Sequence, residues 1–200
     1  MIAVNDVEQL TPEWYALRAG CVTASCFDKL VTSKGAPSKQ AQKYLYTLAG
    51  ERIIGAKAEA YTNAAMERGI EIEDEARRMY RALYDAEVQQ VGFVFKDDSR
   101  TVGCSPDGLI GAHGGLEIKC PILSTHVGYL IENKLPTDYV QQVQGSMYVT
   151  GSHWWDFLSY YPGLKPLLVR VPRDNAFIDK LDAAVTKAVM DLGLIISKIK

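Results

Sequence analysis

Residues 105–119 decide how this chain is interpreted, and they read SPDGLIGAHGGLEIK. Within one predicted strand–turn–strand unit they place two carboxylates and a lysine: Asp107, Glu117 and Lys119. Side chains two positions apart on a strand point the same way, so Glu117 and Lys119 share a face while Ile118 points into the core. If the strand next to Asp107 pairs with this one, the three polar groups converge on one point.

Such a point has the chemistry of a metal-dependent hydrolase. Hard carboxylate oxygens suit Mg²⁺, which keeps several waters and accepts phosphate oxygens as further ligands. A lysine beside the metal can orient or deprotonate the attacking water. The motif therefore predicts metal-assisted hydrolysis of a phosphodiester.

The same residues also have a purely structural interpretation. Ser-Pro-Asp-Gly at 105–108 is a good β-turn sequence, because Pro presets φ, Asp bonds locally and Gly tolerates positive φ. Glu-Ile-Lys at 117–119, taken alone, is typical of an exposed strand face. The joint occurrence of the two motifs, at this spacing and with a strand on each side, favours the catalytic interpretation.

Length and composition are those of an ordinary globular protein. The 200 residues fit one domain with a substantial core, and 48% of them are hydrophobic and 23% charged. No apolar run is long enough to span a membrane and the N-terminus has no signal pattern, so we expect a cytoplasmic protein without a membrane partner. The four cysteines form no CxxC pair, which argues against zinc and a disulfide framework and for buried free thiols.

The charge is unevenly distributed along the chain. The net charge is −2, which argues against a nonspecific nucleic-acid coating protein. Residues 29–57, however, carry an excess of five positive charges, and residues 67–75 carry an excess of four negative charges. A basic segment beside an acidic cluster fits an enzyme that holds a phosphate backbone with one surface and a metal with another. Two solvated helix faces would give the same pattern, and charge alone favours that simpler explanation.

Helix and strand signals follow one another without a repeat or a linker. Helices are predicted from the cap Thr11, over 23–31, 39–54, 59–85 and 136–149, and from the cap Asp174 to the end. Strands are predicted over 88–96, 101–105, 108–111, 115–120, 154–160 and 166–171. In the helix 59–85, helical spacing predicts a buried stripe with Glu73 near its edge, made by Ile72, Ala76, Met79, Tyr80 and Leu83. This order predicts an α+β fold with a mixed central sheet flanked by helices.

Five blocks of sequence, in this order, carry a resemblance to a known family. They are WYALR with VTAS (14–18 and 22–25), GIEIE (69–73), CSPDGL (104–109), LEIKCP (116–121) and QVQGSM (142–147). From about Trp14 to Arg173, the chain resembles the lambda-exonuclease (YqaJ-type) branch of the PD-(D/E)xK nuclease superfamily. The resemblance implies a restriction-endonuclease-like fold in a single nuclease domain, residues 1–200. Its parts would be an N-terminal helical part (1–65), a catalytic core (66–172) and a C-terminal helix (173–200).

The family's activity becomes the functional expectation for this chain. Its members are phage-type recombination nucleases that degrade one strand of duplex DNA, 5′ to 3′, from a 5′-phosphorylated end. They leave a 3′ overhang for a single-strand annealing protein and commonly assemble as a homotrimeric ring. The resemblance thus implies duplex DNA ends and an annealing protein as partners, and the cytoplasm of a bacterial host as the location. One or two Mg²⁺ ions are the implied cofactor, and oxygen ligands alone do not exclude Mn²⁺.

The resemblance also implies the catalytic residues. The ligands of Mg²⁺ would be Asp107, Glu117 and the backbone carbonyl of Ile118. Lys119 would position or activate the attacking water. Glu73 would complete the shell of the metal through water, and Gln142 would hold the water or a nearby phosphate. Gln144 is the weaker candidate, because it points about 200° around the helix from Gln142.

Residues that would contact DNA are implied in the same way. A pocket for the terminal 5′-phosphate would be formed by Arg18, Ser25 and Ser105, because a guanidinium grips phosphate with paired charged hydrogen bonds and hydroxyls add donors. Without the resemblance, Arg18 would pass for a surface charge and Ser25 for the neighbour of a helix cap. Further DNA contacts are implied for Met66, as an apolar wedge between terminal base pairs, and for Lys39 and Lys43. A core methionine and two solvated lysines are the structural alternatives.

Three other functions are alternatives to the exonuclease. A structure- or sequence-selective endonuclease on the same fold would cut a closed circle. A non-catalytic DNA-binding scaffold for recombination is disfavoured by the intact set of Asp107, Glu117 and Lys119. A metal-stabilised structural domain would leave unexplained why that set is accompanied by Arg18, Ser25 and Gln142.

Overall fold

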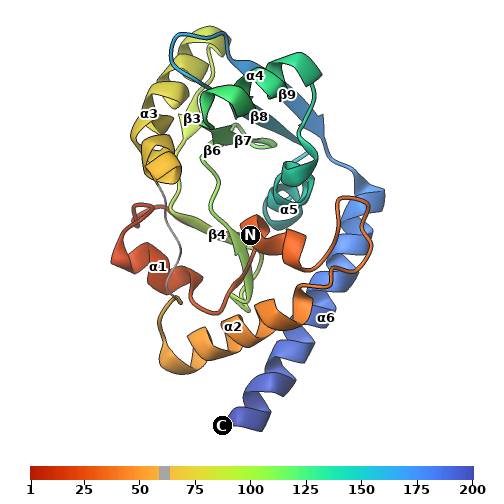
Figure 1. Ribbon diagram of the computed structural model, residues 1–200. Coiled ribbons are helices and arrows are strands. Elements are labelled where there is room, and N and C mark those ends of the chain that lie inside the picture. The colour runs from red at the N-terminus through yellow and green to blue at the C-terminus, as the bar shows by residue number, and fades with distance from the viewer. Residues whose placement is uncertain (59–63) are drawn as a thin grey trace.

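Two mixed β-sheets with helices packed against them make up the fold (Figure 1). The computed structural model describes residues 1–58 and 64–200, and it describes side chains for 1–58 and 67–200. Its helices are α1 (Pro12–Arg18), the 3₁₀ helix η1 (Ala24–Lys29), α2 (Ala41–Ile54), α3 (Ala64–Tyr84), α4 (Leu123–Glu132), the 3₁₀ helix η2 (Thr137–Tyr139), α5 (Val140–Thr150) and α6 (Asn175–Ile199). Its strands are β1 (Ile2–Val4), β2 (Val22–Thr23), β3 (Val88–Gln89), β4 (Phe93–Phe95), β5 (Val102–Cys104), β6 (Gly108–Ile110), β7 (Gly114–Lys119), β8 (Trp154–Ser159) and β9 (Leu167–Pro172).

The strands divide between a five-stranded sheet, β3-β6-β7-β8-β9, and a four-stranded sheet, β1-β4-β5-β2. Each sheet contains one parallel pair, β7–β8 in the first and β2–β5 in the second, and its other pairs are antiparallel. The predicted α+β class with mixed strand pairing is therefore confirmed. The sequence did not indicate that the strands form two sheets.

The chain passes from one sheet to the other within residues 88–96, where a single strand was predicted and is wrong. Val88 lies in β3 of the five-stranded sheet, whereas Phe93 lies in β4 of the four-stranded sheet. Between them, the Gly92 N–H donates to the Val4 carbonyl at 3.0 Å. A Cβ on Gly92 would lie 1.9 Å from a backbone carbonyl oxygen of the N-terminal segment. Glycine permits this close approach, so the apolar run continues while its pairing partner changes.

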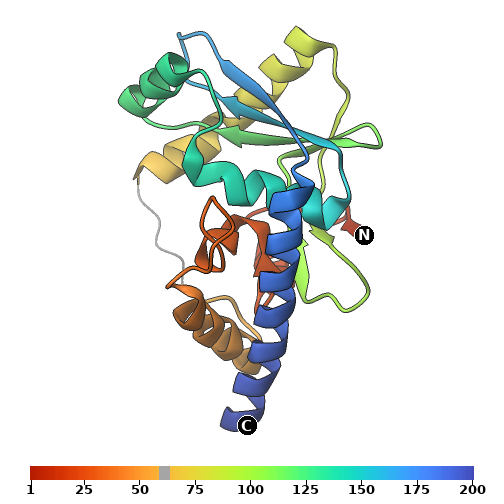
Figure 2. The same cartoon turned by 90° about the vertical axis from the view of Figure 1, so that its right-hand side faces the viewer.

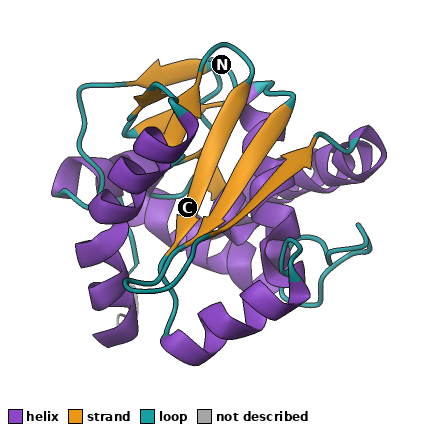
Figure 3. Ribbon diagram, turned by 90° about the horizontal axis from the view of Figure 1, so that it is seen from above, coloured by secondary structure: helices purple, strands orange, loops and turns teal. Residues whose placement is uncertain are grey.

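The motif of residues 105–119 lies in the middle of the five-stranded sheet. β7 pairs antiparallel with β6 and parallel with β8, and a connection containing α4 and α5 joins β7 to β8. On one face, α3 packs against β7 and β8 through a cluster that contains Ala76, Tyr80, Leu116 and Ile118. α5 packs against β8 in the main core cluster, which contains Val143, Met147 and Phe157. Figure 3 shows helices on both sides of these strands. The motif thus presents alternate side chains to two different helices.

The C-terminal helix α6 packs against other helices of the fold. It runs alongside α2 and also touches α5 (Figure 2). Leu48 of α2 and Leu181 of α6 are fully buried in the main core cluster. Asp174 caps α6 as predicted, because its carboxylate accepts the Phe177 N–H at 3.0 Å.

Most predicted elements are confirmed, with differences at their ends. Thr11 caps α1 and Pro12 lies in its first turn. The helix predicted over 23–31 is the 3₁₀ helix η1, and the helix predicted over 136–149 begins as η2 and continues as α5. In α3 the predicted stripe is only partly correct: Ala76 and Tyr80 are buried, but Leu83 is 58% exposed near the end of the helix. Residues 59–63 of the predicted helix 59–85 lie outside the described residues.

Three elements were not predicted, because they are very short or lack a capping signal: β1, β2 and α4. The two strands are only three and two residues long, too short for a pattern of alternation. α4 begins at Ile122 without a side-chain cap and ends at Asn133 with φ 46°, so the usual polar signal at its start is missing. All four cysteines are free, as predicted, although Cys26 and Cys120 are only partly buried. In the described part of the chain, no helix has both the length and the apolar character needed to cross a membrane.

Candidate active site

The pairing of β6 with β7 brings the three residues of the core motif together, as the sequence predicted. Asp107 precedes β6, and its Oδ2 accepts the backbone N–H of Ile118 at 2.6 Å. On β7, the Lys119 Nζ lies 2.6 Å from the Glu117 Oε1. Ile118 points to the other side, into the cluster with α3. The alternation along β7 therefore selects which side chains reach the site.

α5 contributes the predicted glutamine from the side of the sheet that Glu117 faces. The Gln142 Nε2 donates to the Glu117 Oε1 at 2.6 Å. Gln144 points away, since its amide donates to the Pro172 carbonyl and accepts the Asp174 N–H, both at 2.9 Å. The choice of Gln142 over Gln144 is thus consistent with the geometry. The ring of Tyr139 lies 5.3 Å from the Lys119 Nζ.

Glu117 has the properties of a cation ligand. Its side chain is 2% exposed, and its Oε2 is buried without a hydrogen-bond partner among the described residues. Burying a carboxylate oxygen without a hydrogen-bond donor costs free energy unless a cation or a water molecule binds to it. No set of three or more His, Cys, Asp and Glu residues within the described chain is grouped to hold a metal ion. Two carboxylates and a backbone carbonyl suffice for Mg²⁺, which keeps several of its waters, so the residues present fit this ion.

Burial and mutual repulsion raise the pKa values of the carboxyl groups in the site. Burial raises the pKa of Glu117 to about 7, with Lys119 opposing the rise and Asp107 adding to it. Burial and the charge of Asp107 raise the pKa of Glu73 to about 7. Burial also raises the pKa of Asp107. Burial lowers the pKa of Lys119, but Glu117 and Asp107 outweigh this effect and raise it above the ordinary value. A cation placed here would relieve the repulsion between the carboxylates.

These pKa shifts predict how stability depends on pH in metal-free protein. The pKa values of Glu73 and Glu117 are about 7 in the fold, against an ordinary 4.5. Between these values the folded state binds more protons than the unfolded state, so the free energy of unfolding falls as the pH rises from about 5 to about 7. Urea denaturation in EDTA should show this fall, and added Mg²⁺ should oppose it because it favours the charged carboxylates. The double variant Glu73→Gln/Glu117→Gln is the control; an undiminished fall in this variant would contradict the assignment.

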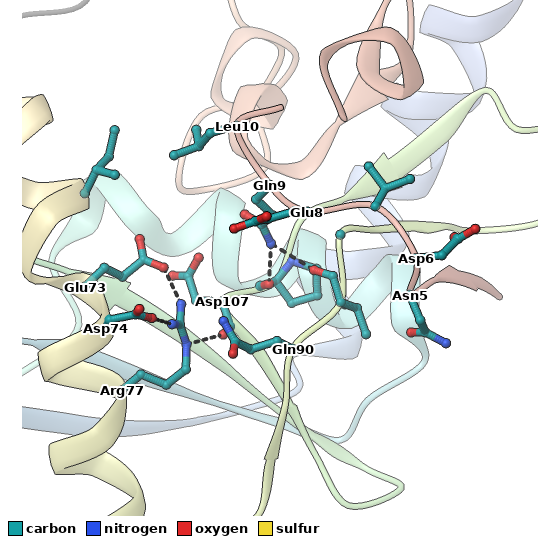
Figure 4. A pocket seen from close by; sticks show the side chains of 15 residues that line it. Asn5, Asp6, Glu8, Gln9, Leu10, Glu73, Asp74, Arg77, Gln90 and Asp107 are labelled. Carbon is teal, nitrogen blue, oxygen red and sulfur yellow. Dashed lines mark hydrogen bonds and ion pairs between the residues drawn. The ribbon is translucent and has the colours of Figure 1, made fainter. Parts of the chain in front are cut away.

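Glu73 approaches the site from α3, where Arg77 holds it. Figure 4 shows Glu73 and Asp107 close together at a cavity of about 620 Å³ that is bounded by α3 and the N-terminal segment. The Arg77 guanidinium donates to the Glu73 Oε1 at 2.5 Å, to the Asp107 carbonyl at 3.1 Å and to Asp74. Gln9 closes the cavity by donating to the carbonyls of Val91 and Pro106. Sequence reasoning missed Arg77, although its spacing of four residues from Glu73 on a helix was an available signal.

The three residues of the predicted phosphate pocket are also brought together. The Arg18 Nη1 donates to the Ser105 Oγ at 2.8 Å, and its Nη2 donates to the Ser25 Oγ at 3.1 Å. Trp14, whose role was missed, supports this group: its Nε1 donates to the Ser105 Oγ at 3.0 Å, and its ring lies 4.3 Å from the Arg18 guanidinium. One cavity of about 140 Å³ is lined by Arg18, Ser25 and Ser105 and also by Asp107, Glu117, Lys119 and Gln142. The phosphate pocket and these four catalytic residues therefore face the same space, whereas Glu73 lines the larger cavity, which also includes Asp107.

Of the remaining predicted DNA contacts, the two lysines are not part of this space. Lys39 and Lys43 are exposed and do not line the cavity that contains Arg18. The side chain of Met66 lies outside the described residues.

Comparison with known proteins agrees with this geometry. The family model of the YqaJ-like viral recombinase domain matches residues 13–153. An alkaline exonuclease from Laribacter hongkongensis (LHK-Exo) is 34% identical, with 94% of this chain and 96% of that chain covered and a TM-score of 0.86. The structure of LHK-Exo in complex with dAMP gives 34% identity, 95% and 96% coverage and a TM-score of 0.85. A phage related exonuclease from Haemophilus somnus 129PT shares the fold, with 16% identity, 90% and 96% coverage and a TM-score of 0.69. No curated protein matches this chain.

Proposed function

Because this chain belongs to the YqaJ-like viral recombinase family, we propose that it is a Mg²⁺-dependent exonuclease of DNA recombination. It degrades one strand of duplex DNA, 5′ to 3′, from a 5′-phosphorylated end, and leaves a 3′ overhang. One observation carries the proposal: the cavity that contains Asp107, Glu117 and Lys119 also contains Arg18 and Ser105. The 34% identity to the alkaline exonuclease LHK-Exo supports nuclease activity.

The residues of the core motif divide the chemical work. Asp107, Glu117 and the Ile118 carbonyl would hold Mg²⁺, with Glu73 acting through water. Bound there, Mg²⁺ would supply polarisation of the scissile phosphate and a more acidic water. Lys119 orients the attacking water for in-line attack, and its charge stabilises the developing negative charge. Gln142 fixes the Glu117 carboxylate through their 2.6 Å hydrogen bond.

Arg18, Ser25 and Ser105 select the end of the strand. A terminal phosphate carries close to two negative charges and three strong acceptor oxygens, whereas an internal phosphodiester carries one charge. The forked guanidinium of Arg18 and the two hydroxyls offer matching donors on one side of the catalytic group. A 5′-phosphate bound by these residues would lie in the same cavity as the catalytic group, which supports selection of ends over internal sites.

The assembly and the partners are proposed from the family resemblance. We expect a homotrimeric ring around the DNA and a single-strand annealing protein that receives the 3′ overhang. Topological linkage by a ring would keep the enzyme on its substrate over many cycles. Light scattering of the purified protein measures the oligomer directly, and a monomeric mass would contradict this part of the proposal.

A strand-specific digestion tests the polarity. A linear duplex carries a 5′-phosphate on one strand only, and each strand carries a different fluorophore at its 3′ end. With Mg²⁺, the phosphorylated strand should shorten progressively while retaining its 3′ label, the 5′-hydroxyl strand should shorten much more slowly, and EDTA should stop the reaction. Loss of the 3′ labels before the strands shorten would show digestion from the opposite end and would overturn the proposed polarity.

A further inference from the structure

Arg18 is both the last residue of α1 and the first residue of a tight turn. The Cys21 N–H donates to the Arg18 carbonyl at 3.0 Å, which closes the turn. Ala19 has φ −60° and ψ 118°, and Gly20 has φ +67°. These angles describe a type II turn, whose third position requires positive φ and therefore favours glycine. The backbone from which the Arg18 side chain projects is thus defined by the turn around Gly20.

α2 holds this turn through both backbone groups of Gly20. The Glu51 Oε2 accepts the Gly20 N–H at 2.8 Å, and the Arg52 Nε donates to the Gly20 carbonyl at 2.8 Å. The two side chains are neighbours in the last turn of α2. A Cβ on Gly20 would lie 2.1 Å from the Arg52 Cγ, so the arginine stem packs directly on the turn. The turn has little freedom to move relative to α2.

Burying the Glu51 carboxylate beside this turn costs free energy. It is only 1% exposed, and a buried carboxylate is tolerated only when it is well paired. Its other contacts come from the Lys57 Nζ, at 2.8 and 3.1 Å, and from the Ala58 N–H at 3.1 Å. It does not line the cavity of the catalytic residues. The hydrogen bonds and the ion pair of this carboxylate hold two segments against α2: the turn after Arg18 and residues 57–58.

We infer that Glu51 and Arg52 are positioning residues for recognition of the strand end. They fix the turn at Gly20, and through it they fix the place from which Arg18 reaches Ser25 and Ser105. Trp14 orients the guanidinium from the side, at 4.3 Å, but the backbone origin of the Arg18 side chain depends on the turn. The inference rests on the proposed role of Arg18 in binding a 5′-phosphate. It assigns end selectivity to two residues of α2 that do not line the cavity of the catalytic residues.

The test compares cleavage rates of 5′-phosphorylated and 5′-hydroxyl duplex ends in Glu51→Gln and Arg52→Met. Loosening the turn should lower the rate on phosphorylated ends by about three- to tenfold, the typical effect of one or two hydrogen bonds, and leave the rate on hydroxyl ends unchanged. A general loss of folded protein would lower both rates together. Asp156→Asn is the matched control, because Asp156 is a fully buried carboxylate bound by Tyr80 and Arg170 in a separate network.

The possible results separate the inference from the proposed function. If the wild type prefers phosphorylated ends and both α2 variants keep that preference, the inference is overturned. If the wild type has no preference, the proposed pocket fails, and the inference fails with it. Should Glu51→Gln not fold, Arg52→Met decides alone, because it removes one bond to Gly20 and leaves no buried charge unpaired. Asp156→Asn should keep the full preference; a reduction equal to that of the α2 variants would also overturn the inference.

Discussion

Lys119→Ala should reduce hydrolysis of duplex DNA by a factor on the order of 10²–10⁴, the range for loss of a positioned acid–base group. The Lys119 Nζ lies 2.6 Å from the Glu117 Oε1 and is the lysine that lines the small cavity. Its loss would remove the group proposed to orient the water, together with the positive charge beside the buried carboxylates. The measurement is the single-turnover rate of strand loss with saturating Mg²⁺, which separates chemistry from product release.

The control for this variant is a lysine outside the site. Lys134→Ala removes an exposed lysine just after α4, with a side chain that is 66% exposed, and should leave the rate unchanged. Circular dichroism should show both variants folded, and fluorescence anisotropy in EDTA should show that Lys119→Ala still binds DNA. Cleavage by Lys119→Ala at the rate of the wild type would remove Lys119 from the mechanism.

Arg18→Ala should lower the rate on 5′-phosphorylated ends by about 10–100-fold, because charged hydrogen bonds contribute about 1.5–3 kcal/mol. The rate on 5′-hydroxyl ends should change little, since they lack the phosphate that Arg18 is proposed to bind. Arg18→Lys should be intermediate, because it keeps the charge but loses the forked donors that reach Ser25 and Ser105. The measurement is the ratio of the two rates for each variant.

Arg78→Ala provides the comparison for Arg18, because Arg78 is an exposed arginine of α3. It should retain the preference of the wild type for phosphorylated ends. If Arg18→Ala retained it as well, a structural role beside Trp14 would be the better account of Arg18.

The core of the site could be predicted from sequence because its residues are close along the chain. Asp107 directly precedes β6, and Glu117 and Lys119 lie on the neighbouring β7, so the alternation rule and one turn are enough to bring them together. The resemblance implied Gln142, and helical geometry disfavoured Gln144 because it points to another side of the helix. Arg18, Ser25 and Ser105 lie up to 87 positions apart, and only the family resemblance united them. The matching family model confirms that resemblance.

The features that were missed depend on long-range contacts without a local signal. The change of sheet at Gly92 is set by the N-terminal segment, which is far away in sequence. Trp14 looks like an ordinary core residue until its indole N–H is seen to donate to Gly92 and Ser105. Arg77 likewise looks like a solvated residue of a charged helix, yet its guanidinium is buried against Glu73 and Asp107. Such roles follow from tertiary packing and not from spacing.

The most direct test of the account compares three DNA substrates of the same sequence with Mg²⁺ present. They are a linear duplex with 5′-phosphates, the same duplex with 5′-hydroxyls, and a covalently closed circle. The account predicts rapid loss of the phosphorylated strands, slower attack on the hydroxyl ends and an intact circle. Nicking or linearisation of the circle would contradict it, because an enzyme that needs a terminal phosphate beside Arg18 has no place to begin on DNA without ends.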